Sequence, residues 1–456
     1  MAERPDPGTS VVLFTRDLRT RDHPALVAGA SSDRTVPLFV LDDAALAAHH
    51  SVNRSRFLLD CLHDLRDRLR ELDGDLVLRR GGWIDEVLGV VDQVGAGQVH
   101  VSDDVSAFAR RRLDRLDAAL GERDVQLCRH QGVTVVPPGA TAPSGGGPWK
   151  VFTPFHRRWA EHEWRPVLHA PEVLAVPSGL SVGRIPALER IAAGDPSPAL
   201  PQGGETAGLA QLKAWAGQDL ADYEDLHDDL AAAATSQISP YLHFGCLSPL
   251  EVATRLRDRP GGAAFVRQLC WRDFYHQVLA DRPEAAQRDY RDRNDHWRED
   301  PDELDAWKQG RTGFPLVDAG MRQLQAEGFM HNRARMVVAS FLTKDLYLDW
   351  RRGAAHFMDW LVDGDVANNQ LNWQWTAGTG TDTNPHRIFN PTTQSKRFDA
   401  DGTYIRRWVP ELADVDAPEI HEPSDETRQR TGYPAPLVDH HEAIEAYKAQ
   451  QAAQAR

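Results

Sequence analysis

Short apolar runs alternate with segments of helical periodicity from residue 11 onward, and this alternation is the strongest constraint on the fold. The runs are VVLF, VPLFVL, LVLRR, QVHVS, VQLCRH and VTVVP, and residues 53–72 between the second and third repeat their apolar side chains at helical spacing. Buried strands separated by helices are typical of a parallel α/β sheet. We therefore expect a Rossmann-like α/β domain with a parallel sheet over residues 1–140.

Three further features set the expected domain organisation. The first run is followed by TRDLRTRDHPAL rather than a GxGxxG loop, so an ordinary dinucleotide-binding domain is not favoured. Residues 141–205 include a long tract rich in Pro and Gly, which predicts a long interdomain connection. From residue 206 to 456 apolar side chains recur every three or four residues, which predicts an all-α domain.

Composition excludes several classes of protein. The formal net charge is −15, which argues against indiscriminate coating of nucleic acid but allows a local basic face. The four cysteines lack metal-ligand spacing, so we expect buried free thiols and no metal site. Apolar runs are too short to span a membrane and the start does not resemble a signal peptide, so we expect a cytoplasmic protein without membrane contact.

Tryptophans are concentrated in the second part of the chain. Only Trp83 of the 13 precedes residue 140. Indoles usually fill cores, but so many together also suit stacking on a planar ligand or base, or a relay of electrons. The stretch DGDVANNQLNWQWTAGTGTD places Trp373 and Trp375 one residue apart among acids, amides and glycines, and leaves these three roles open.

Hydroxyl side chains precede one predicted helix in the stretch ATSQISPYLHFG. Thr235, Ser236 and Ser239 stand where hydroxyls and unsatisfied backbone N–H groups meet. Two readings are open, because such residues either cap the helix or form an anion site.

Two other stretches group polar side chains on helix faces. Helical spacing in RQLCWRDFYHQ brings Gln268, Trp271 and Arg272 to one side. In HNRARMVV it brings Asn332 and Met336 to one face, with an arginine on either side. A solvated charged helix is the alternative for the second stretch, although an amide and a thioether are unusual choices for it.

Long blocks in the second part of the chain carry a family resemblance. They are TSQISPYLHFGCLSP, RQLCWRDFY, TGFPLVDAGMRQL, HNRARMVVASFLTKDLYLDW, DGDVANNQLNWQWTAGTGTD and RIFNPTTQSKRFDADGTYIRRWVPEL. In this order they resemble the signature blocks of the photolyase/cryptochrome flavoproteins, and VVLFTRDLRTRDHPAL resembles the opening of that family's N-terminal domain. The resemblance implies that the helical domain binds FAD, bent so that adenine approaches isoalloxazine, and that light drives electron transfer.

The resemblance assigns FAD-binding positions residue by residue. Arg335 and Asp363 match an ion pair over the flavin ring, Asp365 matches the carboxylate that bonds its N3 side, and Asn369 matches the residue facing flavin N5. Asn at the last position is usual in photolyases, whereas several cryptochromes carry Asp or Cys. The full set that we expect to bind FAD is Tyr223, Thr235, Ser236, Gln237, Ile238, Ser239, Arg272, Arg335, Asp363, Asp365 and Asn369.

The neighbouring tryptophans receive different roles from the resemblance. Trp271 and Trp375 match indoles that line the cavity for a dimerised pyrimidine pair taken out of the DNA stack. Trp373 matches the indole beside the flavin that starts an electron relay, which continues through Trp350 and ends near the surface at Trp297.

Substrate class is implied by the same face. Asn332 and Met336 match side chains that photolyases of cyclobutane pyrimidine dimers (CPDs) set against the lesion, whereas (6-4) photolyases typically carry a histidine pair there. Gln268 departs from the pattern, because many CPD enzymes carry Glu, which supplies a carboxyl proton that an amide lacks. Gln237 and His227 replace frequent arginines, so phosphate contacts are expected to be fewer.

Basic residues near the end of the blocks are expected to contact DNA phosphates. Between Pro385 and Trp408 five Arg and Lys stand against two Asp, a local charge of +3. The expected phosphate contacts are Arg333, Arg387, Lys396 and Arg397.

A second, light-harvesting chromophore is expected in the N-terminal domain. Arg16, Arg54 and Asp104 match positions of deazaflavin-binding photolyases, which favours 8-HDF over 5,10-methenyltetrahydrofolate. Ordinary surface charge is the alternative for these residues.

The sequence therefore predicts a monomeric, light-driven lyase that repairs CPDs in UV-damaged DNA with reduced FAD. A cryptochrome-type photoreceptor with a signalling partner, and a photolyase of (6-4) photoproducts, are the alternatives. Asn369 favours the lyase, and Gln268 favours the photoreceptor. A dark flavin oxidoreductase lacks an evident nicotinamide site.

Overall fold

The computed structural model describes residues 8–48 and 51–454, which form two compact units drawn from interleaved segments. The first unit comprises the described part of Met1–Asp195 together with Pro201–Ala221 and Ser236–Pro283. Pro196–Leu200, Asp222–Thr235 and the described part of Glu284–Arg456 make up the second. The sequence predicted domain boundaries at residues 140 and 206. The two units divide the chain in another way and do not test these boundaries, which stay a prediction.

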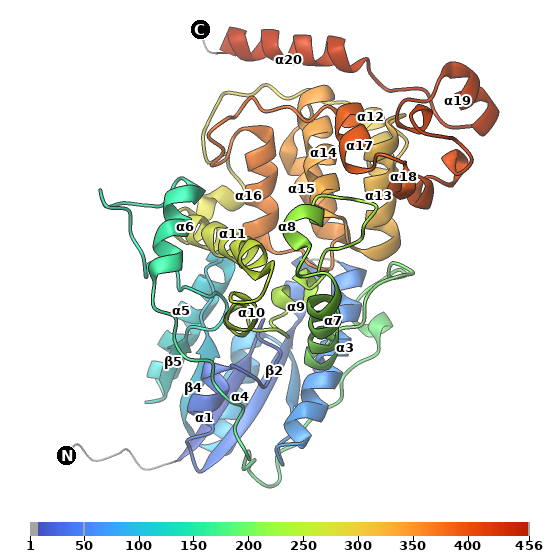
Figure 1. The fold of residues 1–456 in the computed structure, drawn as a ribbon. Helices are drawn as coiled ribbons and strands as arrows, with labels where there is room; N and C mark the ends of the chain where they lie inside the picture. The colour runs from blue at the N-terminus through green and yellow to red at the C-terminus, as the bar shows by residue number, and fades with distance from the viewer. Residues whose placement is uncertain (1–7, 49–50, 455–456) are drawn as a thin grey trace. The chain divides into compact units, whose positions relative to one another are not determined.

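A five-stranded parallel sheet forms the centre of the first unit (Figure 1). Its spatial order is β3-β2-β1-β4-β5, so the chain crosses from one side of β1 to the other between β3 and β4. The strands are β1 (Thr9–Phe14), β2 (Arg34–Asp42), β3 (Val77–Gly81), β4 (Ala96–Ser102) and β5 (Gln126–His130). Five of the six apolar runs thus form strands, and the predicted parallel α/β sheet is confirmed.

The sixth run, VTVVP, forms no strand. The N–H groups of Val135 and Val136 both donate to the Oδ2 atom of Asp273, at 2.9 Å each. Two successive N–H groups on a strand point in opposite directions, so one acceptor atom cannot serve both within a ladder. The valines are buried, but in an irregular segment held by a carboxylate from a distant helix.

Helices follow the strands in the sequence, and two of them, α4 and α5, share a buried apolar core with the sheet. Several begin at a side-chain cap: Ser51 accepts from the Arg54 N–H and Ser106 from the Ala109 N–H. These helices are α1 (Pro24–Gly29), α2 (Asp43–Ala48), α3 (Val52–Arg70), α4 (Trp83–Val94) and α5 (Ala107–Gly121).

The expected connection over residues 141–205 is mostly irregular, as its composition predicted, but it contains a helix that the sequence did not indicate. Helix α6 (Phe152–Glu161) buries Phe152, Phe155 and Trp159, and η1 (Leu188–Arg190) is a short 3₁₀ turn. Beyond α6 the chain follows the sheet, since the Leu78 N–H of edge strand β3 donates to the Val182 carbonyl at 2.8 Å.

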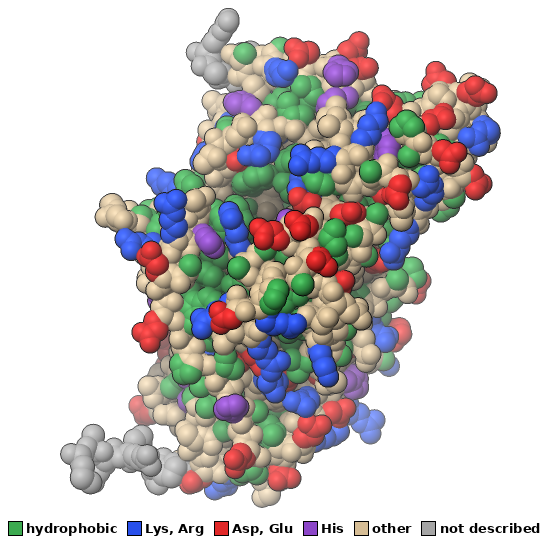
Figure 2. Space-filling view, in the orientation of Figure 1, with side chains coloured by type: hydrophobic (Ala, Val, Ile, Leu, Met, Phe, Trp, Pro, Cys, Tyr) green, Lys and Arg blue, Asp and Glu red, His purple; other side chains and the backbone are tan. Residues whose placement is uncertain are grey.

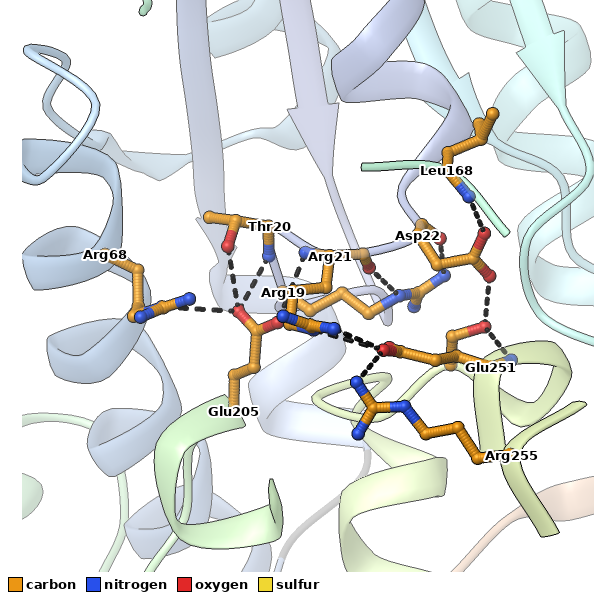
Figure 3. Close-up of polar contacts among 10 residues, drawn as sticks. Arg19, Thr20, Arg21, Asp22, Arg68, Leu168, Glu205, Glu251 and Arg255 are labelled. Carbon is orange, nitrogen blue, oxygen red and sulfur yellow. Dashed lines mark hydrogen bonds and ion pairs between the residues drawn. The ribbon is translucent and has the colours of Figure 1, made fainter. Parts of the chain in front are cut away.

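Four further helices complete the first unit: α7 (Glu205–Gln218), α9 (Ser239–His243), α10 (Pro249–Leu256) and α11 (Gly262–Asp281). Figure 3 shows how the segment after β1 is tied to α7 and α10. The buried Glu205 carboxylate accepts from the Thr20 N–H at 2.9 Å and the Arg21 N–H at 3.2 Å, and Arg21 also pairs with Glu251 at 2.7 Å. The polar segment TRDLRTRDH is therefore a structural tie within this unit.

Every named secondary-structure element in the described part of the second unit is a helix or a helical turn, as predicted (Figure 1). Its core gathers side chains from most of these helices, including Trp307, Trp350 and Trp373. The α-helices of this unit are α8 (Tyr223–Leu226), α12 (Pro301–Lys308), α13 (Pro315–Glu327), α14 (Asn332–Ser340), α15 (Trp350–Trp360), α16 (Val366–Ala377), α17 (Pro391–Phe398), α18 (Thr403–Trp408), α19 (Asp425–Thr431) and α20 (His440–Gln454). A π-helical turn, η3 (Phe341–Asp345), follows α14 directly. None of the helices in the described part of the chain has the length and apolar character needed to cross a bilayer.

Candidate functional site

A bidentate ion pair stands between α14 and the segment before α16. The two terminal nitrogens of Arg335 lie 3.1 Å and 2.9 Å from the two carboxylate oxygens of Asp363. Arg335 also donates through Nε to the Met330 carbonyl at 2.7 Å, so its guanidinium is held at three points. The predicted pair is therefore formed, and such fork geometry fixes both side chains.

The start of α16 is shaped by Asp365. This nearly buried carboxylate caps the helix by accepting from the Asn368 N–H at 2.9 Å and the Asn368 side chain at 2.7 Å. One turn later the buried Asn369 amide donates to the Ala354 carbonyl of α15 at 3.1 Å. Its carbonyl oxygen is thereby oriented away from α15, so the amide has a defined direction.

Trp373 and Trp375 leave α16 in different directions, because residues two apart on a helix do not share a face. Trp373 is buried, with its ring centroid 5.0 Å from that of Phe357 and 6.0 Å from that of Trp307, both in edge contact. Trp375 is half-buried, and the guanidinium carbon of Arg387 lies 5.2 Å from its ring centroid.

Gln374, between the two indoles, was not singled out from the sequence. It is fully buried, accepts from the Tyr290 N–H at 2.7 Å and donates to the Ala285 carbonyl at 2.6 Å. Its amide therefore fixes the rotation of α16 and so decides which indole is buried. The signal that could have found it is its polarity beside a core tryptophan, since a buried amide needs hydrogen-bond partners.

The other two expected relay tryptophans lie in the same unit. Trp350 is fully buried and donates through Nε1 to Asp289 at 2.8 Å. Trp297 lies half-buried in the irregular segment before α12, with its ring centroid 5.0 Å from that of Tyr347. Burial thus decreases from Trp350 to Trp297, as expected for a path that ends near the surface.

One face of α14 presents the amide and thioether predicted for the lesion. The Asn332 amide donates to the Met336 sulfur at 3.8 Å, so the two side chains lie together. Arg333 is engaged by the Asp228 carboxylate and by the Phe398 ring, whose centroid lies 4.3 Å from its guanidinium carbon. A phosphate contact by Arg333 would therefore compete with Asp228.

The other predicted phosphate contacts also have neighbours. Arg387 lies 3.4 Å from Asp382, and Lys396 lies 3.5 Å from Glu422. Arg397 lies over the Phe398 ring, 4.9 Å from its centroid. Figure 2 shows Lys and Arg side chains interspersed with Asp and Glu on the face that it draws.

The predicted FAD-phosphate segment is divided between the two units. In the second, Tyr223 is buried, which raises its pKa, and its carbonyl contacts His227 Nδ1 at 3.0 Å. In the first, Ser236 is buried and Ser239 begins α9, with Ile238 buried between them. Gln237 is exposed with a φ of 51°, a left-handed conformation that strains a residue with a side chain.

Helix α11 in the first unit carries the remaining predicted group. Trp271 stacks face to face on Phe152 of α6, with ring centroids 3.6 Å apart and planes at 5°. Arg272 donates to the Val133 carbonyl at 2.6 Å, and Gln268 is exposed. Phe152 is a contact that the sequence did not predict, although FTPF carries aromatic residues at helical spacing.

Two of the three predicted antenna residues, Arg16 and Asp104, lie just beyond the carboxyl ends of two adjacent strands. Arg16 follows β1 and pairs with Asp104, which follows β4, at 3.0 Å. The sheet order reverses between these strands, and ligands of open α/β sheets bind at such switch points. The structure thus pairs Arg16 with Asp104 directly. The third predicted residue, Arg54, lies in the first turn of α3.

One buried pair near this edge was not predicted. His23 lies 3.0 Å from Asp17, and both side chains are inaccessible to solvent. Burial raises the pKa of Asp17, but the His23 charge and hydrogen bonds outweigh it and lower that pKa to about 2. Among the described residues no cluster of three or more His, Cys, Asp or Glu is arranged to hold a metal ion.

Comparison with known proteins agrees with this geometry. Residues 265–453 match the FAD binding domain of DNA photolyase, and residues 10–174 match DNA photolyase. A deoxyribodipyrimidine photo-lyase from Streptomyces griseus is 52% identical over 95% of this chain and 97% of its own.

Solved structures give the same result. A bacterial class III photolyase from Agrobacterium tumefaciens has a TM-score of 0.92 at 32% identity, covering 100% of this chain and 99% of its own. A Synechocystis cryptochrome has a TM-score of 0.89 at 30% identity, covering 98% and 100%. An archaeal photolyase from Sulfolobus tokodaii, solved with two FAD molecules, has a TM-score of 0.86 at 30% identity, with the same coverage. The chain therefore belongs to the DNA photolyase family, whose FAD-binding domain it contains.

Proposed function

We propose that this chain repairs cyclobutane pyrimidine dimers in DNA by light-driven electron transfer from reduced FAD. One observation carries the proposal: the Arg335–Asp363 pair, the Asp365 carboxylate and the Asn369 amide are grouped at the start of the helix that bears both neighbouring tryptophans. A relative named deoxyribodipyrimidine photo-lyase, which is 52% identical to this chain, supports the same activity.

The side chains of these four residues are chemically suited to bind FAD. An isoalloxazine ring offers an N–H donor and carbonyl acceptors, and Asp365 offers an acceptor for the N–H. The Arg335–Asp363 pair would place balanced charge beside the ring, and Asn369 would present a neutral amide to its N5. The other residues proposed to hold FAD are Tyr223, Thr235, Ser236, Gln237, Ile238, Ser239 and Arg272. Bound FAD supplies the electron that splits the dimer and receives it back afterwards.

The tryptophans Trp373, Trp350 and Trp297 supply electrons that bring oxidised FAD to its active state. Two of them are buried, which excludes water from the path, and Trp350 is held by Asp289. The outermost tryptophan, Trp297, is half-buried, so part of its side chain is exposed to solvent. An electron moves inward along these indoles as an electron hole moves outward.

Asn332, Met336, Gln268, Trp271 and Trp375 contact the lesion. The Asn332 amide bonds a base carbonyl, and Met336 beside it supplies a polarisable apolar contact. Trp375 and Trp271 each offer an indole face for stacking, and Trp271 has its other face covered by Phe152. Gln268 donates N–H bonds to the dimer carbonyls without a carboxyl proton.

Damaged DNA is held through its phosphates by Arg333, Arg387, Lys396 and Arg397. Each is partly neutralised by a neighbouring acid or lies on an aromatic ring. Affinity for intact DNA should therefore be low and dependent on salt. The protein acts as a cytoplasmic monomer in this proposal.

The light-harvesting chromophore is 8-HDF, at the Arg16–Asp104 pair and Arg54. Position at the switch point of the sheet supports a planar ligand there. The Sulfolobus neighbour solved with two FAD molecules makes a second FAD the main competitor. Mass spectrometry of chromophores released from the purified protein decides between 8-HDF, folate and FAD.

The decisive experiment measures repair by the reduced, FAD-loaded protein under blue light. Oligonucleotides with a CPD, with a (6-4) photoproduct and without a lesion are compared, and dimer loss is followed by chromatography. We expect CPD loss alone. Absence of any repair, with photoreduction intact, would favour the second candidate, a photoreceptor, which the cryptochrome neighbour and Gln268 support.

A further inference from the structure

Lys344 is a fully buried lysine in the second unit, on the π-helical turn η3. Turns of this kind are rare and occur often at functional sites. Burying an ammonium group costs free energy unless the group is hydrogen-bonded and its charge is compensated. The partners of this ammonium group therefore decide what it does.

The main partner of Lys344 is the segment between α16 and α17, residues 378–390, which is irregular throughout. The ammonium nitrogen Nζ donates to the Pro385 carbonyl at 2.9 Å. On the α20 side, the ring centroid of Tyr447 lies 5.2 Å from the same nitrogen. Lys344 thus connects the core of the unit to the α16–α17 loop.

Hydrogen bonds inside this loop link Pro385 to Arg387. The Arg387 N–H donates to the Asn384 carbonyl at 3.1 Å, and the Asn384 N–H donates to Asp382 Oδ1 at 3.0 Å. The Arg387 side chain lies 3.4 Å from the same carboxylate. Residues 382–387 therefore form a hydrogen-bonded turn with Pro385 inside it, and the bond from Lys344 fixes the position of that turn.

The turn is packed against the end of α16. Gly378, the C-cap residue of that helix, has a φ of 89°, and a Cβ there would lie 2.2 Å from the Pro385 oxygen. The carbonyl that Lys344 binds is thus in contact with the helix that carries Trp375. Two residues further on, the guanidinium carbon of Arg387 lies 5.2 Å from the Trp375 ring centroid.

We propose that Lys344 is a positioning residue for DNA binding, which holds the α16–α17 loop so that Arg387 contacts a phosphate where Trp375 contacts the lesion. The inference rests on the functions proposed for Arg387 and Trp375. A protonated amine donates a stronger hydrogen bond to a carbonyl than a neutral amine does. The protonation state of Lys344 therefore sets how firmly the loop is held.

Charged and titratable groups face Lys344 from several elements. Burial has the largest effect and lowers the pKa of Lys344 to about 7. On its own turn lies Asp345, which is paired with His440 of α20. The other groups are Arg293 and Asp295 in the segment before α12, and Asp382, His386 and Arg387 in the loop.

The direction of the pH effect follows from this lowered pKa. As pH rises through about 7, Lys344 loses its proton, its hold on Pro385 weakens, and affinity for DNA falls. Stability changes in the opposite direction, because a buried lysine with a lowered pKa favours the folded chain at higher pH. Unfolding therefore cannot account for the expected loss of affinity.

The test is a fluorescence titration of the FAD-loaded protein with CPD-containing and intact oligonucleotides, from about pH 6 to about pH 9. At the acidic end Lys344→Met should weaken both complexes about threefold to tenfold, the effect of one lost hydrogen bond, and it should remove the fall of affinity with pH. The repair rate at saturating DNA should stay unchanged, because Lys344 contacts neither FAD nor DNA. Lys308→Met is the matched control, since Lys308 pairs with Asp305 on α12 and should leave the affinity unchanged at every pH.

A double mutant separates positioning from a general loss of structure. If Lys344 acts through Arg387, adding Lys344→Met to Arg387→Ala should cause little further loss, whereas independent effects would add. Additive losses, an unchanged affinity of Lys344→Met, or a pH dependence that survives this substitution overturns the role of Lys344 and leaves that of Arg387 intact. Unchanged affinity of Arg387→Ala overturns the phosphate contact and this inference with it.

The unmodified protein provides a test that needs no substitution. Its affinity for both oligonucleotides should fall across the same pH range while FAD content and the unfolding temperature are maintained. A constant affinity overturns the inference, whether or not Lys344→Met folds. Absence of any binding to CPD-containing DNA overturns the proposed function itself.

Discussion

Replacing Trp375 with Ala tests the proposed lesion contact most directly. The indole is half-buried, its ring centroid lies 6.4 Å from that of Phe389, and the Arg387 guanidinium lies over its face. Stacking of a base on an aromatic side chain contributes about 1–3 kcal/mol. Because about 1.4 kcal/mol corresponds to a tenfold change in affinity, Trp375→Ala should weaken binding of CPD-containing DNA about tenfold to a hundredfold.

Loss of the cation–π contact with Arg387 adds a smaller effect on all DNA, of about 0.5–1 kcal/mol at an exposed site. The two effects separate in a fluorescence titration with CPD-containing, (6-4)-containing and intact oligonucleotides of one sequence. Trp375→Phe keeps a stacking face and should lose less affinity for CPD DNA than Trp375→Ala. Arg387→Ala should weaken all three complexes alike and reduce the slope of log affinity against log salt by about 0.9.

Equal weakening of all three complexes by Trp375→Ala would refute the reasoning. In that case the indole acts only by positioning Arg387. A loss of bound FAD in Trp375→Ala would also contradict it, because this side chain is proposed to contact the lesion and not the cofactor.

Four other predictions follow from single positions. Trp373→Phe should abolish photoreduction of oxidised FAD, followed by absorbance, while repair by chemically reduced protein is retained. Arg54→Ala should lower uptake of 8-HDF and shorten the long-wavelength part of the repair action spectrum. Burial lowers the pKa of Lys344 from 10.5 to about 7. Between these pH values the folded chain binds fewer protons than the unfolded chain, so the free energy of unfolding rises with pH, by at most about 5 kcal/mol. Lys344→Met should flatten that rise, as measured by urea titrations across this pH range. Gly353→Ala should lower the free energy of unfolding by about 1–3 kcal/mol and alter indole fluorescence, because the added Cβ would lie 2.2 Å from the Trp373 ring.

The sheet could be predicted because its central strands β1, β2 and β4 are largely buried on both faces and the strands are separated by helical segments. VTVVP has the same local pattern but forms no strand. The N–H groups of Val135 and Val136 donate instead to Asp273, which lies 138 and 137 positions further along the chain. Desolvation raises the pKa of Asp273 to about 6, against the effect of Arg272 and of the N–H donors. A partner so distant leaves no periodic signal in the run itself.

The opposite orientations of Trp373 and Trp375 follow from helix geometry alone, because two residues span about 200°. Which indole becomes buried does not follow from it. That choice depends on Gln374, whose amide bonds Tyr290 and Ala285, and on the absence of a side chain at Gly353, where Trp373 packs. Family resemblance supplied the assignment in advance, and the contacts give its physical cause.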